Sequence, residues 1–320
     1  MHKVYITGAA GMIGSSLACE LVKSGYEVIG IDDLSRGKMI NLNQIIENDS
    51  FSFYKSDISN DITWAENLSS DDTLIHLADI VAGIDFVFKN EWSIFNKNVE
   101  INSNIAKAID RKPPSHFIYI GTACSYPQGL QRSTDKSGLV EEDKLPADPE
   151  SGYGWGKLVG DIEYNLLKKS KDFIYTNIDL HNVYGSPCDF DPRTAQVIPS
   201  LIYKSLHNES LDVWGDGLQG RAFVEVRDVV RAIKLAIENP VNETFMIGPN
   251  HCTTIKEVVE EILKNDTKAK SAVYDITKPT GDIGRFYSGT KSKDLLGWEP
   301  EISFADGIKD LVKYIKLNDC

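Results

Sequence analysis

The sequence predicts an α/β protein in which a doubly wound parallel sheet is followed by a smaller, interwoven C-terminal subdomain. Short apolar runs of strand length alternate with longer stretches of helical apolar spacing through the first half of the chain. This alternation is typical of parallel sheets with helices on both faces. Beyond residue 185 the alternation loosens, but no low-complexity linker intervenes. The later segment should therefore pack over the first.

The first half of the chain supplies most of the predicted sheet. We expect strands at 2–7, 27–31, 51–55, 73–77, 116–120 and 173–180, with helices at 12–24 and near 93–111 and 153–170. Later we expect helices at 199–207, 227–238 and 254–264, strands at 221–226 and 243–247, and a loop rich in Gly and Pro at 277–289. These elements predict one domain over 1–185, with returns near 221–247, and a second mainly over 186–320.

Composition excludes several classes of function. The net charge of −13 argues against nucleic acid or an anionic membrane as the main partner. No apolar run is long enough to span a membrane. Five scattered cysteines without a C-x-x-C pair argue against a disulfide framework and against a zinc site. We expect a cytoplasmic protein without a metal.

A glycine-rich turn links the first strand to the first helix. It reads Gly8-Ala-Ala-Gly11-Met12-Ile13-Gly14. Glycines there allow close approach of a pyrophosphate, whose charge then lies at a helix N-terminus. The next strand ends in Asp32-Asp33. A carboxylate at Asp32 accepts hydrogen bonds from ribose hydroxyls and would repel a 2′-phosphate by about 4 kcal/mol at 4 Å. The pattern predicts a Rossmann-type site for NAD rather than NADP.

Asp57-Ile58 follows a strand, and residues 76–79 read HLAD. With these two motifs and the glycine turn, the chain resembles the extended short-chain dehydrogenase/reductase family, which contains NAD-dependent nucleotide-sugar epimerases and dehydratases. The resemblance implies that Asp57 and Ile58 lie against adenine and that Leu77 and Ala78 line the cofactor. The family motif reads H-x-A-A, so Asp79 is a departure from it.

Tyr153-Gly-Trp-Gly-Lys157 is a Y-x-x-x-K motif, which places both side chains on one helix face. A neighbouring ammonium group favours phenolate, so we expect Lys157 to lower the pKa of Tyr153 toward neutrality. Tyr153 could then take the proton of a sugar hydroxyl while hydride passes to NAD. The resemblance implies that Thr122 hydrogen-bonds the reacting oxygen.

The resemblance also implies a nucleotide-sugar substrate. Asn182 opens an N-x-Y-G motif, and Arg221 and Arg285 stand in contexts where family members bind diphosphate and ribose. Arginine suits that task because its planar fork binds phosphate oxygens in pairs. Gln196 and Val197 would begin the segment that cradles the nucleobase. Trp214, just before the GDG turn, is a further candidate for substrate contact.

Three stretches, TACSYP at 122–127, GIDFVFKNEWSIFNKN at 83–98 and VWGDGLQGR at 213–221, most resemble two branches of the family, GDP-mannose 3,5-epimerase and GDP-L-fucose synthase. This resemblance favours a GDP-linked sugar. Both branches use a cysteine at the position of Cys124 as an acid/base. The fucose synthase pairs it with a histidine just before V-I-P, where this chain has Gln196. A glutamine cannot transfer protons, so one half of the acid/base pair is missing.

Oxidation at C4 is the step that the residues support without additions, as in some GDP-heptose 4-dehydrogenases of bacterial capsule synthesis. Three alternatives stay open: a C4 epimerase, a C3/C5 epimerase that uses Cys124, and an NAD-binding sensor without catalysis. The resemblance further implies a homodimer formed through the helices near 93–111 and 153–170.

Overall fold

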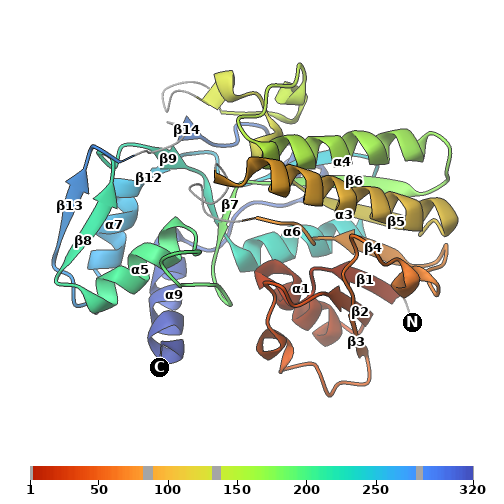
Figure 1. The fold of residues 1–320 in the computed structure, drawn as a ribbon, viewed down its shortest axis with the longest axis horizontal. Coiled ribbons are helices and arrows are strands. Elements are labelled where there is room, and N and C mark those ends of the chain that lie inside the picture. Colours follow the sequence, from red (N-terminus) through yellow and green to blue (C-terminus); the bar gives the residue numbers. More distant parts are fainter. Residues whose placement is uncertain (1–2, 82–88, 132–137, 279–283, 320) are drawn as a thin grey trace.

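The computed structural model describes residues 3–81, 89–131, 138–278 and 284–319. At its centre is a seven-stranded sheet of order β11-β6-β5-β4-β1-β2-β3, and every neighbouring pair is parallel (Figure 1). The strands are β1 (Lys3–Thr7), β2 (Glu27–Asp32), β3 (Phe51–Lys55), β4 (Thr73–His76), β5 (His116–Thr122), β6 (Ile174–Leu180) and β11 (Thr244–Ile247). The predicted parallel sheet of the Rossmann type is confirmed.

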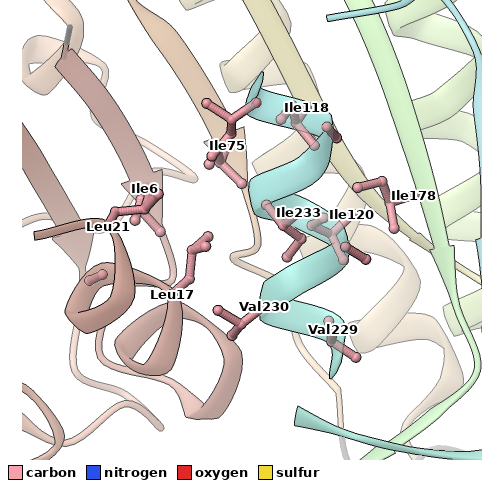
Figure 2. Packing of buried hydrophobic residues seen from close by; sticks show 14 of the residues in the cluster. Ile6, Leu17, Leu21, Ile75, Ile118, Ile120, Ile178, Val229, Val230 and Ile233 are labelled. Carbon is pink, nitrogen blue, oxygen red and sulfur yellow. The ribbon is translucent and has the colours of Figure 1, made fainter. Parts of the chain in front are cut away.

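Helices cover both faces of this sheet. On one face lie α1 (Met12–Lys23) and α6 (Val226–Glu238), and on the other α3 (Glu91–Arg111) and α4 (Gly152–Lys168). Side chains alternate between the two faces along each strand. Figure 2 shows Ile118 and Ile120 of β5 directed toward α6, where they meet Ile233. Phe117 and Tyr119 of the same strand join the core beneath α3 and α4. A strand buried on both faces needs a continuous apolar run, which is how it was recognised.

A third core forms beside the sheet. It is built from α5 (Val197–His207), α7 (Ile255–Leu263), α9 (Phe304–Asn318) and the parallel pair β8 (Ser210–Trp214) and β13 (Ser271–Asp275). Between this core and the large sheet lie β7 (Asn182–Tyr184) with β10 (Phe223–Glu225), and the three-stranded β12 (Thr253–Thr254), β9 (Gly220–Arg221) and β14 (Gly284–Arg285). The other helices within the described residues are α8 (Lys291–Leu296) and the short 3₁₀ helices η1 (Met39–Leu42), η2 (Thr63–Ala65), η3 (Ala123–Ser125), η4 (Gln128–Gln131) and η5 (Glu141–Lys144).

Two expectations about the later segment need correction. The predicted strand at 221–226 is two short strands on either side of Ala222, whose backbone N–H donates to Arg285 and whose carbonyl accepts from Asn182. The helix expected at 199–207 begins earlier, at Val197. Pro199 therefore lies in its first turn, where a missing N–H removes no helical hydrogen bond. None of the helices among the described residues is long and apolar enough to cross a membrane.

Candidate active site

The glycine turn after β1 is closely packed. Gly8 has φ +75°, and a Cβ on it would lie 2.9 Å from the backbone nitrogen of Ala78. A Cβ on Gly14 would lie 2.1 Å from the carbonyl oxygen of Gly8. The N–H of Ala78 in turn donates to the Thr7 hydroxyl at 3.4 Å. The predicted turn and the HLAD segment are thus neighbours, and only glycine lets α1 begin so close to β1.

Asp32 ends β2 beside this turn. Its carboxylate accepts the N–H of Ala10 at 2.9 Å and the N–H of Leu34 at 2.8 Å. Burial raises the pKa of Asp32, and the two amides oppose that rise. A Cβ on Gly37 would lie 2.8 Å from both carboxylate oxygens, so glycine at 37 keeps the space against Asp32 open. A ribose diol could reach the carboxylate there, and the residues fit the adenosine half of a dinucleotide.

Other predicted cofactor residues lie around the same edge. Met12 and Ile13 open α1 and pack against the sheet core, and the N–H of Leu77 donates to Thr7. Ile58 is buried, and Asp57 accepts the N–H and hydroxyl of Ser59 and pairs with Lys97 at 3.4 Å. Asp33 is different, because its carboxylate accepts the N–H and hydroxyl of Ser35 within its own turn. In this structure Asp33 therefore stabilises its own turn.

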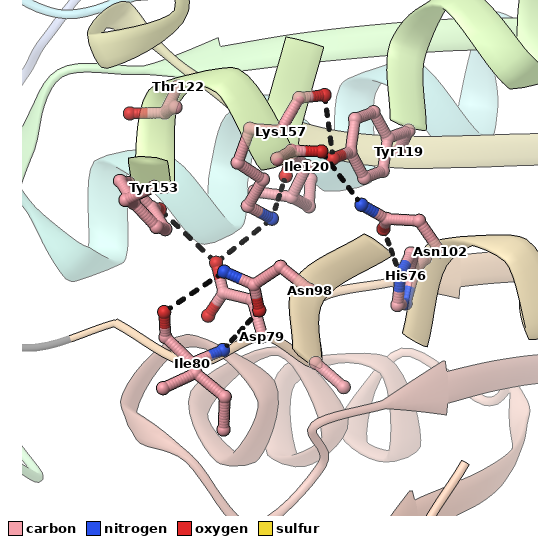
Figure 3. Close-up of polar contacts among 12 residues, drawn as sticks. His76, Asp79, Ile80, Asn98, Asn102, Tyr119, Ile120, Thr122, Tyr153 and Lys157 are labelled. Atoms are coloured by element: carbon pink, nitrogen blue, oxygen red, sulfur yellow. Dashed lines mark hydrogen bonds and ion pairs between the residues drawn. The ribbon is translucent and has the colours of Figure 1, made fainter. Parts of the chain in front are cut away.

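The Y-x-x-x-K pair lies on α4, which Ser151 caps through the N–H of Gly154. Lys157 is almost fully buried, and its ammonium donates to the carbonyl of Ile120 at 2.8 Å and contacts the Asp79 carboxylate at 2.9 Å. The Tyr153 hydroxyl donates to the same Asp79 oxygen at 3.2 Å. Figure 3 shows these contacts converging on Asp79. The structure therefore brings Tyr153 and Lys157 together through a carboxylate.

The expected lowering of the Tyr153 pKa is wrong in this structure. Burial and the neighbouring Asp79 carboxylate hold the pKa of Tyr153 well above the usual range for a phenol. Lys157 does not reverse this, because its charge is balanced by Asp79. The sequence argument counted one cation near the phenol and omitted the anion that both groups contact.

The stretch TACSYP turns sharply after β5 and packs onto the start of α4. The hydroxyl of Thr122 accepts the N–H of Cys124 at 3.2 Å, and the Ser125 hydroxyl donates to the carbonyl of Gly154 at 3.3 Å. A Cβ at Gly154 would lie only 2.2 Å from the carbonyl oxygen of Cys124. The residue after Tyr153 must be glycine for this approach, so Thr122 and Cys124 are held next to the Tyr153 end of α4.

The two predicted phosphate-binding arginines are brought together. Arg221 of β9 and Arg285 of β14 are register partners in a parallel pair, although 64 residues separate them in the chain. Arg285 is buried, and its Nη1 donates to the sulfur of Cys124 at 2.8 Å. Two arginines paired on neighbouring strands favour an anionic ligand. The contact links Arg285 with Cys124, which sequence reasoning had assigned to different parts of the substrate.

The other substrate candidates lie on the elements around this pair. Asn182 begins β7, opposite Phe223, and Gln196 is the N-cap residue of α5 without a side-chain capping bond. Val197 and Trp214 are each about two-fifths exposed, at 39% and 42%. The ammonium of Lys278 lies 5.8 Å from the centre of the Trp214 ring. Residues 83–88 of the stretch 83–98, and residues 281–283 just before Arg285, lie outside the described residues.

Comparison with known proteins identifies the family. The model of the NAD-dependent epimerase/dehydratase family matches residues 4–248. The chain belongs to this family. A Methanocaldococcus jannaschii protein named for UDP-glucose 4-epimerase is 30% identical over 99% of both chains. GDP-mannose 3,5-epimerase 1 of Oryza sativa subsp. indica is 29% identical over 98% of this chain and 82% of its own length.

A solved structure of this epimerase/dehydratase family has the same fold over almost all of the chain. UDP-glucuronic acid 4-epimerase from Bacillus cereus, in complex with UDP-glucuronic acid and NAD, superposes with a TM-score of 0.85 at 26% identity and 99% coverage of both chains. The protein is accordingly an NAD-dependent enzyme of the epimerase/dehydratase family, with the predicted cofactor.

The residue that sequence reasoning missed is Asp79. It was noted only as a departure from H-x-A-A, yet it contacts both members of the Y-x-x-x-K pair. The signal was a charge at a position that the family motif gives to a small apolar residue.

Proposed function

We propose that this enzyme oxidises C4 of a nucleotide-activated sugar to a 4-keto sugar nucleotide, with a GDP-linked hexose or heptose as the favoured substrate. The observation that carries the proposal is the joining of Tyr153, Lys157 and the Thr122 turn at one end of β5 and α4. Gln196, in the segment where a second acid/base is expected, supports oxidation without epimerisation at C3 or C5.

Substrate binding in this proposal uses both parts of the molecule. The NAD end occupies the edge around the glycine turn and Asp32, while residues after 185, apart from α6 and β11, hold the nucleotide sugar. Arg221 and Arg285 supply two positive charges for the diphosphate. Asn182 lies beside them, because its N–H donates to the carbonyl of Ala222, the residue after Arg221.

The chain's own groups then manage the proton. NAD, when bound, accepts the hydride that leaves C4. The oxygen of Tyr153 takes the proton of the C4 hydroxyl as it releases its own, and Thr122 donates a hydrogen bond to the C4 oxygen. Positioned proton transfer of this kind contributes about 10²–10⁴ in rate. Lys157 is fixed by the carbonyl of Ile120, so its charge stays at the bottom of the site.

Epimerisation at C4 is the second candidate, because relatives at 26% and 30% identity carry 4-epimerase names. It would require that the hydride return to the other face of the ketosugar. A C3/C5 epimerase would instead need Cys124 to exchange protons, and here its sulfur accepts a hydrogen bond from Arg285.

The test is incubation of the purified enzyme and NAD with GDP-mannose, GDP-heptose, and UDP- and dTDP-sugars. We expect NADH absorbance to rise with a GDP-sugar and a 4-keto product to appear. Tyr153→Phe should lower the rate by about 10²–10⁴, whereas the exposed Tyr54→Phe should not change it. Unchanged behaviour of Tyr153→Phe, with no turnover in either protein, would favour a sensor. Complete inversion at C4 without a ketone would favour epimerisation.

We further propose a cytoplasmic homodimer that acts in bacterial surface-polysaccharide synthesis. Apolar side chains remain exposed on α3 and α4, among them Trp92 at 75%, Ile162 at 45% and Leu166 at 57%. Ile162 and Leu166 are four residues apart and share a face of α4. Sedimentation at micromolar concentration should give a dimer, and Leu166→Glu a monomer. A monomeric unmodified protein would contradict the proposal.

A further inference from the structure

The carboxylate of Asp79 contacts both Tyr153 and Lys157, but the mechanism proposed above assigns it no role. One oxygen, Oδ2, accepts the Tyr153 hydroxyl at 3.2 Å and contacts the Lys157 ammonium at 2.9 Å (Figure 3). The Asp79 side chain is 15% exposed, and that of Lys157 is 2% exposed. A partly buried phenol thus donates to a carboxylate whose charge is balanced by a buried ammonium group.

The backbone on both sides of Asp79 is held by buried side chains. The amide of Asn98 accepts the N–H of Ile80 at 2.7 Å and donates to its carbonyl at 3.2 Å. On the other side, the N–H of Ala78 donates a hydrogen bond to the Thr7 hydroxyl, and a Cβ on Gly8 would clash with the backbone of Ala78. Asn98 is itself 1% exposed and comes from α3. Three elements therefore fix the position from which Asp79 reaches Tyr153, as a fixed proton acceptor requires.

The titratable groups around Tyr153 come from four elements. Asp79 faces it from the segment after β4, Lys157 from α4, Cys124 from η3 and Tyr119 from β5. Burial and the Asp79 charge keep the pKa of Tyr153 high. A phenol in these surroundings is protonated at neutral pH, so it can take a proton from a sugar only as it releases its own.

We propose that Asp79 is the acceptor of that proton. The C4 hydroxyl gives its proton to the oxygen of Tyr153, the Tyr153 O–H bond breaks, and its proton moves to Oδ2 of Asp79. The electron pair of the C4 oxygen forms the carbonyl as the hydride leaves for NAD. Tyr153 is a neutral phenol before and after the step, and Asp79 ends as a carboxylic acid. Its partial exposure then lets the proton pass to solvent.

This inference rests on the proposed oxidation, and Asp79 acts through Tyr153 rather than on the sugar. The critical variant is Asp79→Asn, which keeps the shape of the side chain but removes the acceptor and its charge. Asp266→Asn is the matched control, because the Asp266 side chain is 99% exposed on the surface and pairs with Lys316.

Two measurements test it. The first needs neither substrate nor activity: tyrosine ionisation is followed by ultraviolet absorbance, and each protein is compared with its own Tyr153→Phe counterpart. In Asp79→Asn the signal of Tyr153 should move to lower pH than in the unmodified protein, because Lys157 then acts on the phenol unopposed. No movement would overturn the inference, whatever reaction the enzyme runs.

The second measurement is the pH profile of turnover. The unmodified enzyme should hold a level rate between about pH 6.5 and 9, since its acceptor is a carboxylate. Asp79→Asn should lose at least tenfold at pH 7 and regain rate with rising pH as phenolate forms. A uniform loss with an unchanged profile would show a merely structural contribution and overturn the relay. Lack of turnover in every protein, with the ionisation shift present, would instead count against C4 oxidation.

Discussion

Replacing Lys144 by methionine should destabilise the protein strongly, because Lys144 balances two buried carboxylates. Its ammonium lies 2.8 Å from Asp161 and 2.6 Å from Asp179, and the three side chains are 11%, 10% and 1% exposed. Asp179 also accepts the hydroxyl of Tyr126, at the end of the TACSY turn, at 2.9 Å. The cluster thus contacts the end of the turn that carries Thr122.

The expected size follows from the charges that remain. Removing one partner of a buried ion pair costs about 3–5 kcal/mol, because the other charge is left without compensation. Lys144→Met leaves two buried anions, whereas the matched variant Asp161→Asn leaves one cation and one anion. We therefore expect Lys144→Met to lose about 3–5 kcal/mol of unfolding free energy and Asp161→Asn clearly less.

The loss should also depend on pH. Burial raises the pKa of Asp179, and the charge of Lys144 opposes that rise. Without Lys144 the folded state binds protons more readily than the unfolded state, so the stability of Lys144→Met should increase as pH falls. Urea denaturation at pH 8 and pH 5, followed by tryptophan fluorescence, should show the gap to the unmodified protein narrowing at pH 5. A gap below 1 kcal/mol at pH 8, or one no larger than that of Asp161→Asn, would refute the reasoning.

Three further outcomes are expected. Gly14→Ala should weaken NAD binding at least tenfold in calorimetry, because the added Cβ would lie 2.1 Å from the carbonyl oxygen of Gly8. The control Gly129→Ala should bind NAD normally, because a Cβ at Gly129 would have no atom within 4 Å. Burial lowers the pKa of His76 and of His181 to about 3. Each histidine should therefore stabilise the folded state fully above pH 6.5, and the free energy of unfolding should fall by about 1.4 kcal/mol per pH unit for each of them as the pH drops toward 3. If the free energy of unfolding of His181→Phe depended on pH as steeply as that of the unmodified protein, this prediction would be contradicted. Trp298→Ala should lose about 3–5 kcal/mol of unfolding free energy, measured by urea denaturation. The Trp298 ring is 1% exposed, and its N–H donates to the carbonyl of Asp228 at 2.8 Å. A loss below 1 kcal/mol would be inconsistent with that packing.

The sequence was sufficient for the large sheet because its strands carry strong local signals. β1 and β2 are apolar runs that end at a glycine turn and at Asp32, and β5 is buried along its whole length. The pair β8 and β13 was missed because β8 buries only two of its five residues and β13 buries none fully. Helices α8 and α9 were missed too, although Ser303 caps α9 through Asp306. Weak or short patterns gain their structure from neighbours that sequence alone does not identify.

The site shows the same division. The glycine turn, Asp32 and the Y-x-x-x-K pair were recognisable because each is a local motif with a physical purpose. The contact of Arg285 with Cys124 spans 161 residues, and that of Tyr153 with Asp79 spans 74. Both depend on how separate loops meet at the ends of the strands. The wrong direction for the Tyr153 pKa followed from this, since sequence reasoning saw neither the burial of the phenol nor the Asp79 carboxylate beside it, both of which raise that pKa.

The central claim is C4 oxidation without return of the hydride, and one measurement tests it most directly. The enzyme is incubated with NAD and a GDP-sugar that carries deuterium at C4, and both the nicotinamide and the sugar are analysed by NMR. The account predicts that deuterium appears on the nicotinamide of the reduced cofactor and that the sugar carries a ketone at C4. Deuterium retained at a C4 of inverted configuration, with no reduced cofactor accumulating, would contradict it.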